Sequence, residues 1–433
     1  AEHQEKLPGE IHQGRIPENF NPTQPERLKG RNHSPGGMEA SRLAHRPEVD
    51  LLLCCARTNL SSENVEQVRG LLHSEMDWNY LLRMAGGHGL IPLLFFNLKN
   101  NFPDLVPAPI TDRLHVQFLA NAGRNVFLAE ELLKILALLE TNAIPAIPYK
   151  GPVLAVSLYG NLTLRTFGDL DIIVRKPDVQ RAKALLFSRG YRLDLSLTRE
   201  QEIAFLNSDL EGWFVRQEGM VRVEVRWGER KDFPLAPDFE PFWKRLRQYS
   251  FQGRMVLTFS PEDLLLLLCL HGAEHCWDRL NWICDLIELV RVHKGIDWGG
   301  LIDRAEVLGC RRVLLVGLFL AHDFLATPLP AEIVKTIRGD SSVRSLAVRV
   351  HERLFHYENG PAATLQRSLF NLKVTERLQD RIRYCLRLAF HPSVVDWQAL
   401  PLPRSLFFLY YVIHPLRVAG KYARQYLKHL FYT

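Results

Sequence analysis

The stretch Gly168-Asp169-Leu170-Asp171-Ile172-Ile173-Val174 decides the fold, because it places two carboxylates on an otherwise apolar strand. Side chains two residues apart on a strand point to the same face, so Asp169 and Asp171 are expected to lie close together. Such a pair repels itself unless a cation sits between the carboxylates, and hard oxygen ligands favour magnesium. The pattern is typical of phosphoryl or nucleotidyl transfer.

A glycine junction lies upstream of the acids. Residues 144–149 predict a short apolar strand that runs into Lys150-Gly151-Pro152, and residues 152–159 predict a helix with proline in its first turn. A glycine there lets backbone amides approach a phosphate, which the helix dipole also favours. We therefore expect Lys150 and Gly151 to cradle a nucleotide phosphate, and we group Gly168 with them as a nucleotide-binding residue.

Arg165 precedes the acids by a few residues, and its guanidinium matches phosphate geometry. We expect it to hold the triphosphate. The structural alternative is an ion pair with Asp169 or Asp171 that only holds the loop.

A third carboxylate stands in the alternating segment Val221-Arg222-Val223-Glu224-Val225-Arg226-Trp227. The valines are expected to pack on one face of a strand, while Glu224 shares the other face with two arginines. If this strand lies beside the one with Asp169, Glu224 completes a triad of acids. Three such acids could hold two Mg²⁺ ions that activate a hydroxyl, orient a triphosphate and stabilise the leaving pyrophosphate.

These residues carry a resemblance to a known family. Lys150-Gly151, Arg165, the Asp169–Asp171 stretch and Val223-Glu224-Val225 resemble the uncharacterised nucleotidyltransferase family of the DNA polymerase beta superfamily, whose relatives include antitoxin-paired toxins. The resemblance extends from about Asp50 onward and includes motifs such as His88-Gly89-Leu90, Leu270-His271, Arg279-Leu280 and Asp285. It implies an α/β (α+β) nucleotidyltransferase core with a small mixed sheet, flanked by helical domains.

The resemblance also implies an activity: magnesium-dependent transfer of a nucleoside monophosphate from a nucleoside triphosphate to an acceptor, with release of pyrophosphate. The acceptor, which could be a small molecule, a peptide, a saccharide or a protein, is not indicated. The chain departs from the superfamily pattern in having Lys150-Gly151 in place of Gly-Ser, and Arg226 where close relatives carry a histidine.

His271-Gly272-Ala273-Glu274-His275 spells the inverted zinc-protease pattern, with both histidines on one helical face. We do not favour zinc, because glycine follows the first histidine and no third ligand is apparent. His271, His275, Arg279 and Asp285 are instead candidates to line the nucleotide or acceptor cleft, with ordinary helix packing as the alternative.

Composition indicates a multidomain cytoplasmic enzyme. The 433 residues, 47% hydrophobic, exceed the usual size of a single core. Seven cysteines without a Cys-x-x-Cys pair predict reduced, buried thiols. We expect a disordered tail or extension at 1–37, an N-terminal helical domain at 38–142, the catalytic core at 143–260 and a C-terminal helical domain at 261–433.

The carboxyl end, residues 400–433, combines aromatic and basic residues with no acid. Such a segment could make peripheral contact with an anionic membrane, touch nucleic acid, or pack onto the helical domain. A net charge of +6 is too modest to favour a nucleic-acid enzyme.

Two other function classes stay open from the sequence. One is a catalytically degenerate nucleotidyltransferase fold that serves as a binding or scaffold module. The other is a toxin-like transferase, or one that modifies a peptide or polysaccharide.

Overall fold

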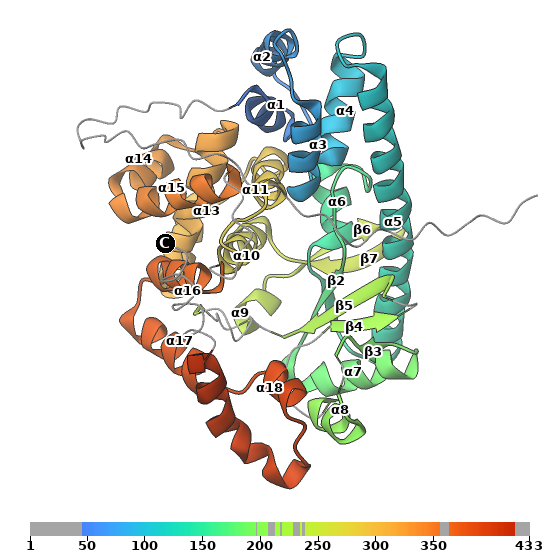
Figure 1. The fold of residues 1–433 in the computed structure, drawn as a ribbon, viewed down its shortest axis with the longest axis vertical. Coiled ribbons are helices and arrows are strands. Elements are labelled where there is room, and N and C mark those ends of the chain that lie inside the picture. Colours follow the sequence, from blue (N-terminus) through green and yellow to red (C-terminus); the bar gives the residue numbers. More distant parts are fainter. Residues whose placement is uncertain are drawn as a thin grey trace, which may run out of the picture. The chain divides into compact units, whose positions relative to one another are not determined.

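A computed structural model describes residues 46–420 apart from 196, 207–212, 217–218, 228–233, 236–238 and 356–362 (Figure 1). The tail or extension expected at 1–37 lies outside the described residues, as does the end of the chain beyond residue 420.

The centre of the fold is a five-stranded mixed sheet with strand order β1-β2-β5-β4-β3. β2 (Leu170–Val174) is parallel to β5 (Val221–Arg226), whereas the other neighbouring strands are antiparallel. The strand with Asp171 and the strand with Glu224 are therefore side by side. The remaining strands of this sheet are β1 (Ala146–Pro148), β3 (Arg192–Leu193) and β4 (Trp213–Arg216).

The two faces of the sheet pack into different hydrophobic clusters. Ile172, Val223 and Val225 lie in one cluster with the second half of α5 (Ala108–Thr141) and with α7 (Val179–Ser188). Ile173 belongs to the other cluster, which contains α10 (Pro261–Glu274) and α11 (Leu280–Val292). Because side chains alternate along a strand, Asp171 shares the face of Ile173 and points toward α10.

The helices before and after the sheet share one core. Buried residues of α1 to α4 belong to the same cluster as those of α10 to α15. Figure 1 shows these two groups next to each other. The helices of this shared core are α1 (Pro47–Cys55), α2 (Ser62–Leu72), α3 (Trp78–Gly87), α4 (Ile91–Asn101), α10, α11, α12 (Trp298–Val307), α13 (Arg311–Leu325), α14 (Ala331–Gly339) and α15 (Ser341–Phe355).

The remaining elements are short or lie toward the carboxyl end. They are α6 (Gly151–Tyr159), the 3-10 turn η1 (Lys176–Asp178), α8 (Arg199–Leu206), α9 (Glu240–Trp243), the hairpin β6 (Arg247–Phe251) and β7 (Arg254–Thr258), α16 (Ala363–Val374), α17 (Leu378–Phe390), α18 (Val394–Ala399), η2 (Arg404–Leu409) and a helix at 410–420. Among the described helices, none has the length and apolarity needed to cross a bilayer.

α5 is continuous over 34 residues, although Gly123 lies in its interior. A glycine costs a helix only about 1 kcal/mol. Burial of the side chains of Leu128 and Leu132 stabilises the helix beyond Gly123, so tertiary packing outweighs the low helix propensity of glycine.

His88, which follows α3, gives the fold a pH dependence. Its Nε2 lies 3.1 Å from the carbonyl oxygen of Leu354 in α15. Burial lowers the pKa of His88 from 6.5 to about 4. The unfolded chain therefore binds the proton more tightly, so the contribution is complete above pH 6.5 and is lost as the pH falls toward about 4.

We expect the free energy of unfolding to lose about 3 kcal/mol through His88 over that pH window. Urea unfolding at several pH values measures the loss. Other groups titrate in the same range, so the matched variant is His88→Gln, whose amide can still donate to Leu354 but cannot gain a charge. An equal loss in parent and variant would rule out this role for His88.

Candidate active site

The three predicted acids meet at one end of the sheet. Asp171 and Glu224 are register partners on the parallel strands β2 and β5, and both are buried. Asp169 stands in the bend just before β2, close enough to Asp171 for the two charges to interact. The condition set by the sequence, that the Glu224 strand lies beside the Asp-x-Asp strand, is met.

The two aspartates have pKa values pushed in opposite directions. Burial and the neighbouring charge of Asp171 raise the pKa of Asp169. Burial would also raise the pKa of Asp171, but the charges of Lys150 and Arg226 outweigh it and hold that pKa below its ordinary value. The pKa values of two neighbouring carboxyl groups move apart in this way, because the like charges repel each other. A cation placed between the carboxylates relieves the repulsion.

Lys150 provides a cation at this point. Its Nζ lies 2.9 Å from Oδ2 of Asp171 and 3.3 Å from Nδ1 of His271 in α10. The lysine is brought there by the strand end, because the amide of Tyr149 donates to the main-chain oxygen of Asp171. Lys150 therefore links the acids of the sheet to α10.

The backbone at Lys150 is strained. Its φ of 74° and ψ of −145° lie near a region that is almost restricted to glycine, and Gly151 follows with φ of 54°. Strain of this kind costs on the order of 1–3 kcal/mol and persists where the surroundings fix it. Here it directs the lysine at Asp171, at the start of α6.

His271, Glu274 and His275 of α10 form a cluster beside Lys150. One ligand-capable atom from each lies within 4.8 Å of the others, so Glu274 is a third group of the kind that binds metals, which the sequence analysis did not single out. Lys150 approaches His271, and the guanidinium of Arg226 lies 3.8 Å from the carboxylate of Glu274. These two positive charges compete with a metal ion, so the cluster is better matched to lining the site.

An aromatic surface continues from this cluster. The ring of Trp282 lies 5.1 Å from the rings of both His271 and His275. Arg279, an exposed residue, places its guanidinium 6.0 Å from the centre of the Trp282 ring. The two histidines and Trp282 are each partly exposed. The structure thus brings the predicted cleft residues His271, His275 and Arg279 together with Trp282, which the sequence analysis did not single out.

Arg226 is buried on the same face as Glu224. Its guanidinium extends to Glu274 of α10, and its charge contributes to the lowered pKa of Asp171. Arg226 is therefore a second cation at the site, beside Lys150.

Arg165 and Asp285 form a pair that the sequence analysis did not foresee. Nε and Nη2 of Arg165 each donate to one oxygen of Asp285 at 2.8 Å. The hydroxyl of Tyr159 donates to the same carboxylate at 2.7 Å. Both charged side chains are buried, so the pair anchors the loop before Asp169 to α11. Gly168 is exposed on this loop, and its carbonyl oxygen accepts a hydrogen bond from Arg124.

Gly272, between the two histidine positions, is required by packing. A Cβ at this residue would lie 2.5 Å from three carbon atoms of the Trp277 ring, which is fully buried. On the opposite side, a Cβ at Gly317 would approach the same ring to 3.1 Å. The glycine after His271 therefore makes room for Trp277.

We expect Gly272→Ala to destabilise the protein by about 1–3 kcal/mol, although alanine is the better helix former. The matched control is Gly123→Ala in α5, where no atom lies within 4 Å of the new Cβ and a gain of about 0.5–1 kcal/mol is expected. Urea unfolding measures both. Stabilisation by Gly272→Ala would contradict the packing argument.

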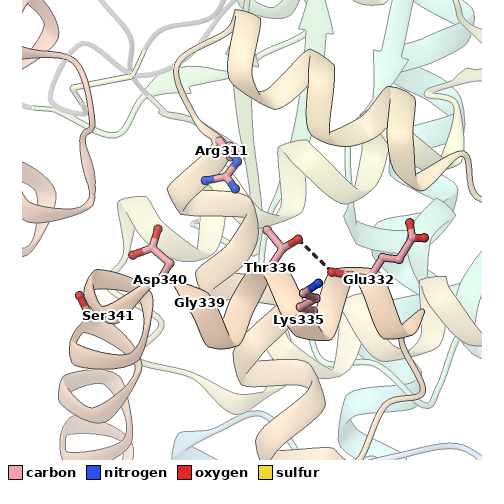
Figure 2. Close-up of a pocket in the computed structure, with 7 residues that line it drawn as sticks. All are labelled: Arg311, Glu332, Lys335, Thr336, Gly339, Asp340 and Ser341. Carbon is pink, nitrogen blue, oxygen red and sulfur yellow. Dashed lines mark hydrogen bonds between the residues drawn. The ribbon is translucent and has the colours of Figure 1, made fainter.

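A surface hollow lies elsewhere, among α13, α14 and α15. Figure 2 shows that it is lined by Arg311, Glu332, Lys335, Thr336, Gly339, Asp340 and Ser341. None of these residues belongs to the acids or to the cluster on α10, so the hollow is separate from the site.

Comparison with known proteins agrees with the chemistry of this site. Residues 74–326, more than half of the chain, match the model of a family described as uncharacterised nucleotidyltransferase. The chain belongs to this family. The matched range of the nucleotidyltransferase model contains the three acids, Lys150, Arg165, Asp285 and the cluster on α10.

A solved structure is also similar to this nucleotidyltransferase family member. It is the crystal structure of an antigenic nucleotidyltransferase-like protein from Paracoccidioides brasiliensis, with 16% identity and a TM-score of 0.30 over 49% of this chain and 95% of that chain. None of the curated proteins matches the chain.

Proposed function

We propose that this protein transfers a nucleoside monophosphate from a nucleoside triphosphate to an acceptor and releases pyrophosphate, with two magnesium ions. The observation that carries the proposal is the register pairing of Asp171 with Glu224, with Asp169 adjacent. Three carboxylates at one end of two parallel strands are costly to build without a cation.

The donor set fits magnesium. All three groups offer carboxylate oxygens, which this ion prefers, and they outnumber the two cations beside them, Lys150 and Arg226. We propose that Asp169 and Asp171 hold both ions and that Glu224 completes the site on the side of the attacking group. When bound, the ions would activate the acceptor hydroxyl, orient the triphosphate and stabilise the leaving pyrophosphate.

The residues around the acids would bind and orient the nucleotide. A triphosphate carries several negative charges, so Lys150 and the amides at Gly151 would meet its phosphates, with Gly168 beside them. Arg165 would act on the triphosphate while it stays anchored to Asp285. His271, His275 and Arg279 would line the cleft with the partly exposed ring of Trp282.

Calorimetric titration tests the proposal. Each of the four ribonucleoside triphosphates is titrated into the protein with and without magnesium, alongside the double variant Asp169→Asn, Asp171→Asn. We expect one or more triphosphates to bind only with magnesium, and the double variant to lose that binding. Failure of every triphosphate to bind a folded protein would favour a degenerate binding or scaffold module.

A further inference from the structure

The carboxyl-terminal helices present an apolar stripe to solvent. Leu378, Ile382, Leu386 and Phe390 follow one another at intervals of four residues along α17, and each is between 51% and 69% exposed. Residues four apart lie on the same side of a helix. Four large apolar side chains in one exposed row are unusual for a protein surface and mark an interaction site.

A second stripe begins in η2 and continues on the helix that follows it, at 410–420. Phe408, Val412 and Leu416 have the same four-residue spacing and are between 58% and 70% exposed. This helix is fixed to the end of α17, because Nε2 of His414 lies 3.1 Å from the main-chain oxygen of Leu388. The two stripes therefore belong to neighbouring helices.

The acids of this region are turned inward. From residue 377 to the end of the chain there are nine lysines and arginines and only two acids, Asp380 and Asp396. Asp380 is buried and pairs with Arg383. Asp396 is fully buried and holds His414 and Arg417, which join α18 to the last described helix. Both acids of the described part of this region are therefore buried, so its exposed charges are positive.

Two arginines at the start of α17 bond to uncharged groups. Arg377 and Arg381 donate to main-chain carbonyl oxygens, which carry no net charge. Long arginine side chains can lie along an apolar surface while their guanidinium groups reach a polar layer. Exposed apolar side chains flanked by such cations are the pattern of a helix that lies in a membrane interface.

We propose that the exposed face of α17 and of the helix at 410–420 docks onto an anionic lipid bilayer. A second copy of the chain is a poor occupant, because a twofold contact would place the same arginines against one another without acids to pair with. A nucleic acid would leave the aliphatic rows without an apolar partner. A bilayer with anionic headgroups satisfies both the apolar rows and the charge.

Cys385 provides a probe at the proposed surface. It is the exposed cysteine of α17, adjacent to Leu386, whereas the other six cysteines are buried. The expectation that all thiols are buried is therefore wrong at this residue. A maleimide carrying an environment-sensitive fluorophore will attach there, and its emission will report transfer into an apolar layer.

We expect the labelled protein to gain fluorescence with vesicles that contain phosphatidylserine, to gain less with phosphatidylcholine alone, and to lose the gain at high salt. Sedimentation of the unlabelled protein with vesicles gives the affinity. Replacing Ile382 and Leu386 by serine should lower that affinity by about ten-fold or more. Arg387→Gln should lower it by about five-fold.

The matched control replaces two exposed apolar residues of α5, Val116 and Leu119, by serine, and it should leave vesicle binding unchanged. Equal losses in both double variants, or no binding to either vesicle, would overturn the proposal. So would self-association in light scattering that is abolished by the α17 variant in the absence of lipid. None of these outcomes depends on nucleotide binding, so the proposal stands or falls apart from the proposed function.

Discussion

We expect Asp171→Asn to lower the proposed magnesium-dependent nucleotidyl transfer by about a hundred- to a thousand-fold, which is the usual effect of removing one electrostatic group from a reacting centre. Asp171 is the best-connected acid of the site, since it is paired with Lys150 and is the register partner of Glu224. Asparagine keeps the shape of the side chain but cannot hold a divalent cation as a carboxylate does, and it leaves the charge of Lys150 without its closest partner.

The measurement uses a triphosphate labelled at the α-phosphate and a fractionated cell extract as the source of acceptor. Label that becomes attached to an acceptor reports transfer. The matched control is Asp303→Asn on the exposed side of α12, which removes the same charge away from the acids. Undiminished transfer by folded Asp171→Asn would place the chemistry elsewhere.

Glu224→Gln separates binding from chemistry in the same assay. If Asp169 and Asp171 hold the nucleotide through the metal and Glu224 serves the attacking group, this variant should bind triphosphate within a few-fold of the parent and yet lose transfer. A parallel loss of binding and transfer would instead assign Glu224 to nucleotide binding.

The three acids could be predicted from the sequence because alternation of apolar and polar residues along a strand is a local signal. Val221–Arg226 alternates strictly, and the apolar run after Asp169 has strand character, so both strands and the faces of their acids followed from period-two reasoning. The sequence analysis gave the pairing of the two strands only as a condition for a triad of acids. The structure meets that condition, because Glu224 is the register partner of Asp171.

Contacts between residues far apart in the sequence could not be predicted in this way, because no local pattern indicates them. Arg165 and Asp285 are 120 residues apart, and each has plausible local roles. Glu274 was not predicted as the third member of the α10 cluster. The glycine after His271 counted against a metal site there, so Glu274 was not assigned a role. Gly272 is needed because the ring of Trp277 packs against it, and the position of that ring cannot be predicted from the helix pattern.

Breaking the pair between Arg165 and Asp285 should destabilise the protein by about 3–5 kcal/mol, because one buried charge is left without its partner. Arg165→Ala removes both donated hydrogen bonds and leaves Asp285 with the hydroxyl of Tyr159. Urea unfolding measures the loss. The double variant Arg165→Met, Asp285→Leu should recover most of it, since an apolar pair of similar volume avoids desolvating two charges.

A further variant, Arg165→Lys, keeps the charge but cannot donate through two nitrogens in the fork geometry. If Arg165 only anchors the loop, Arg165→Lys should lower stability and leave the affinity of the folded protein for magnesium and triphosphate nearly unchanged. If the guanidinium also holds the triphosphate, affinity should fall by about ten-fold or more, the effect of losing a charged hydrogen bond of about 1.5–3 kcal/mol. The loop that carries Asp169 is tied to α11 by this arginine, so stability and nucleotide affinity must be measured on the same variant.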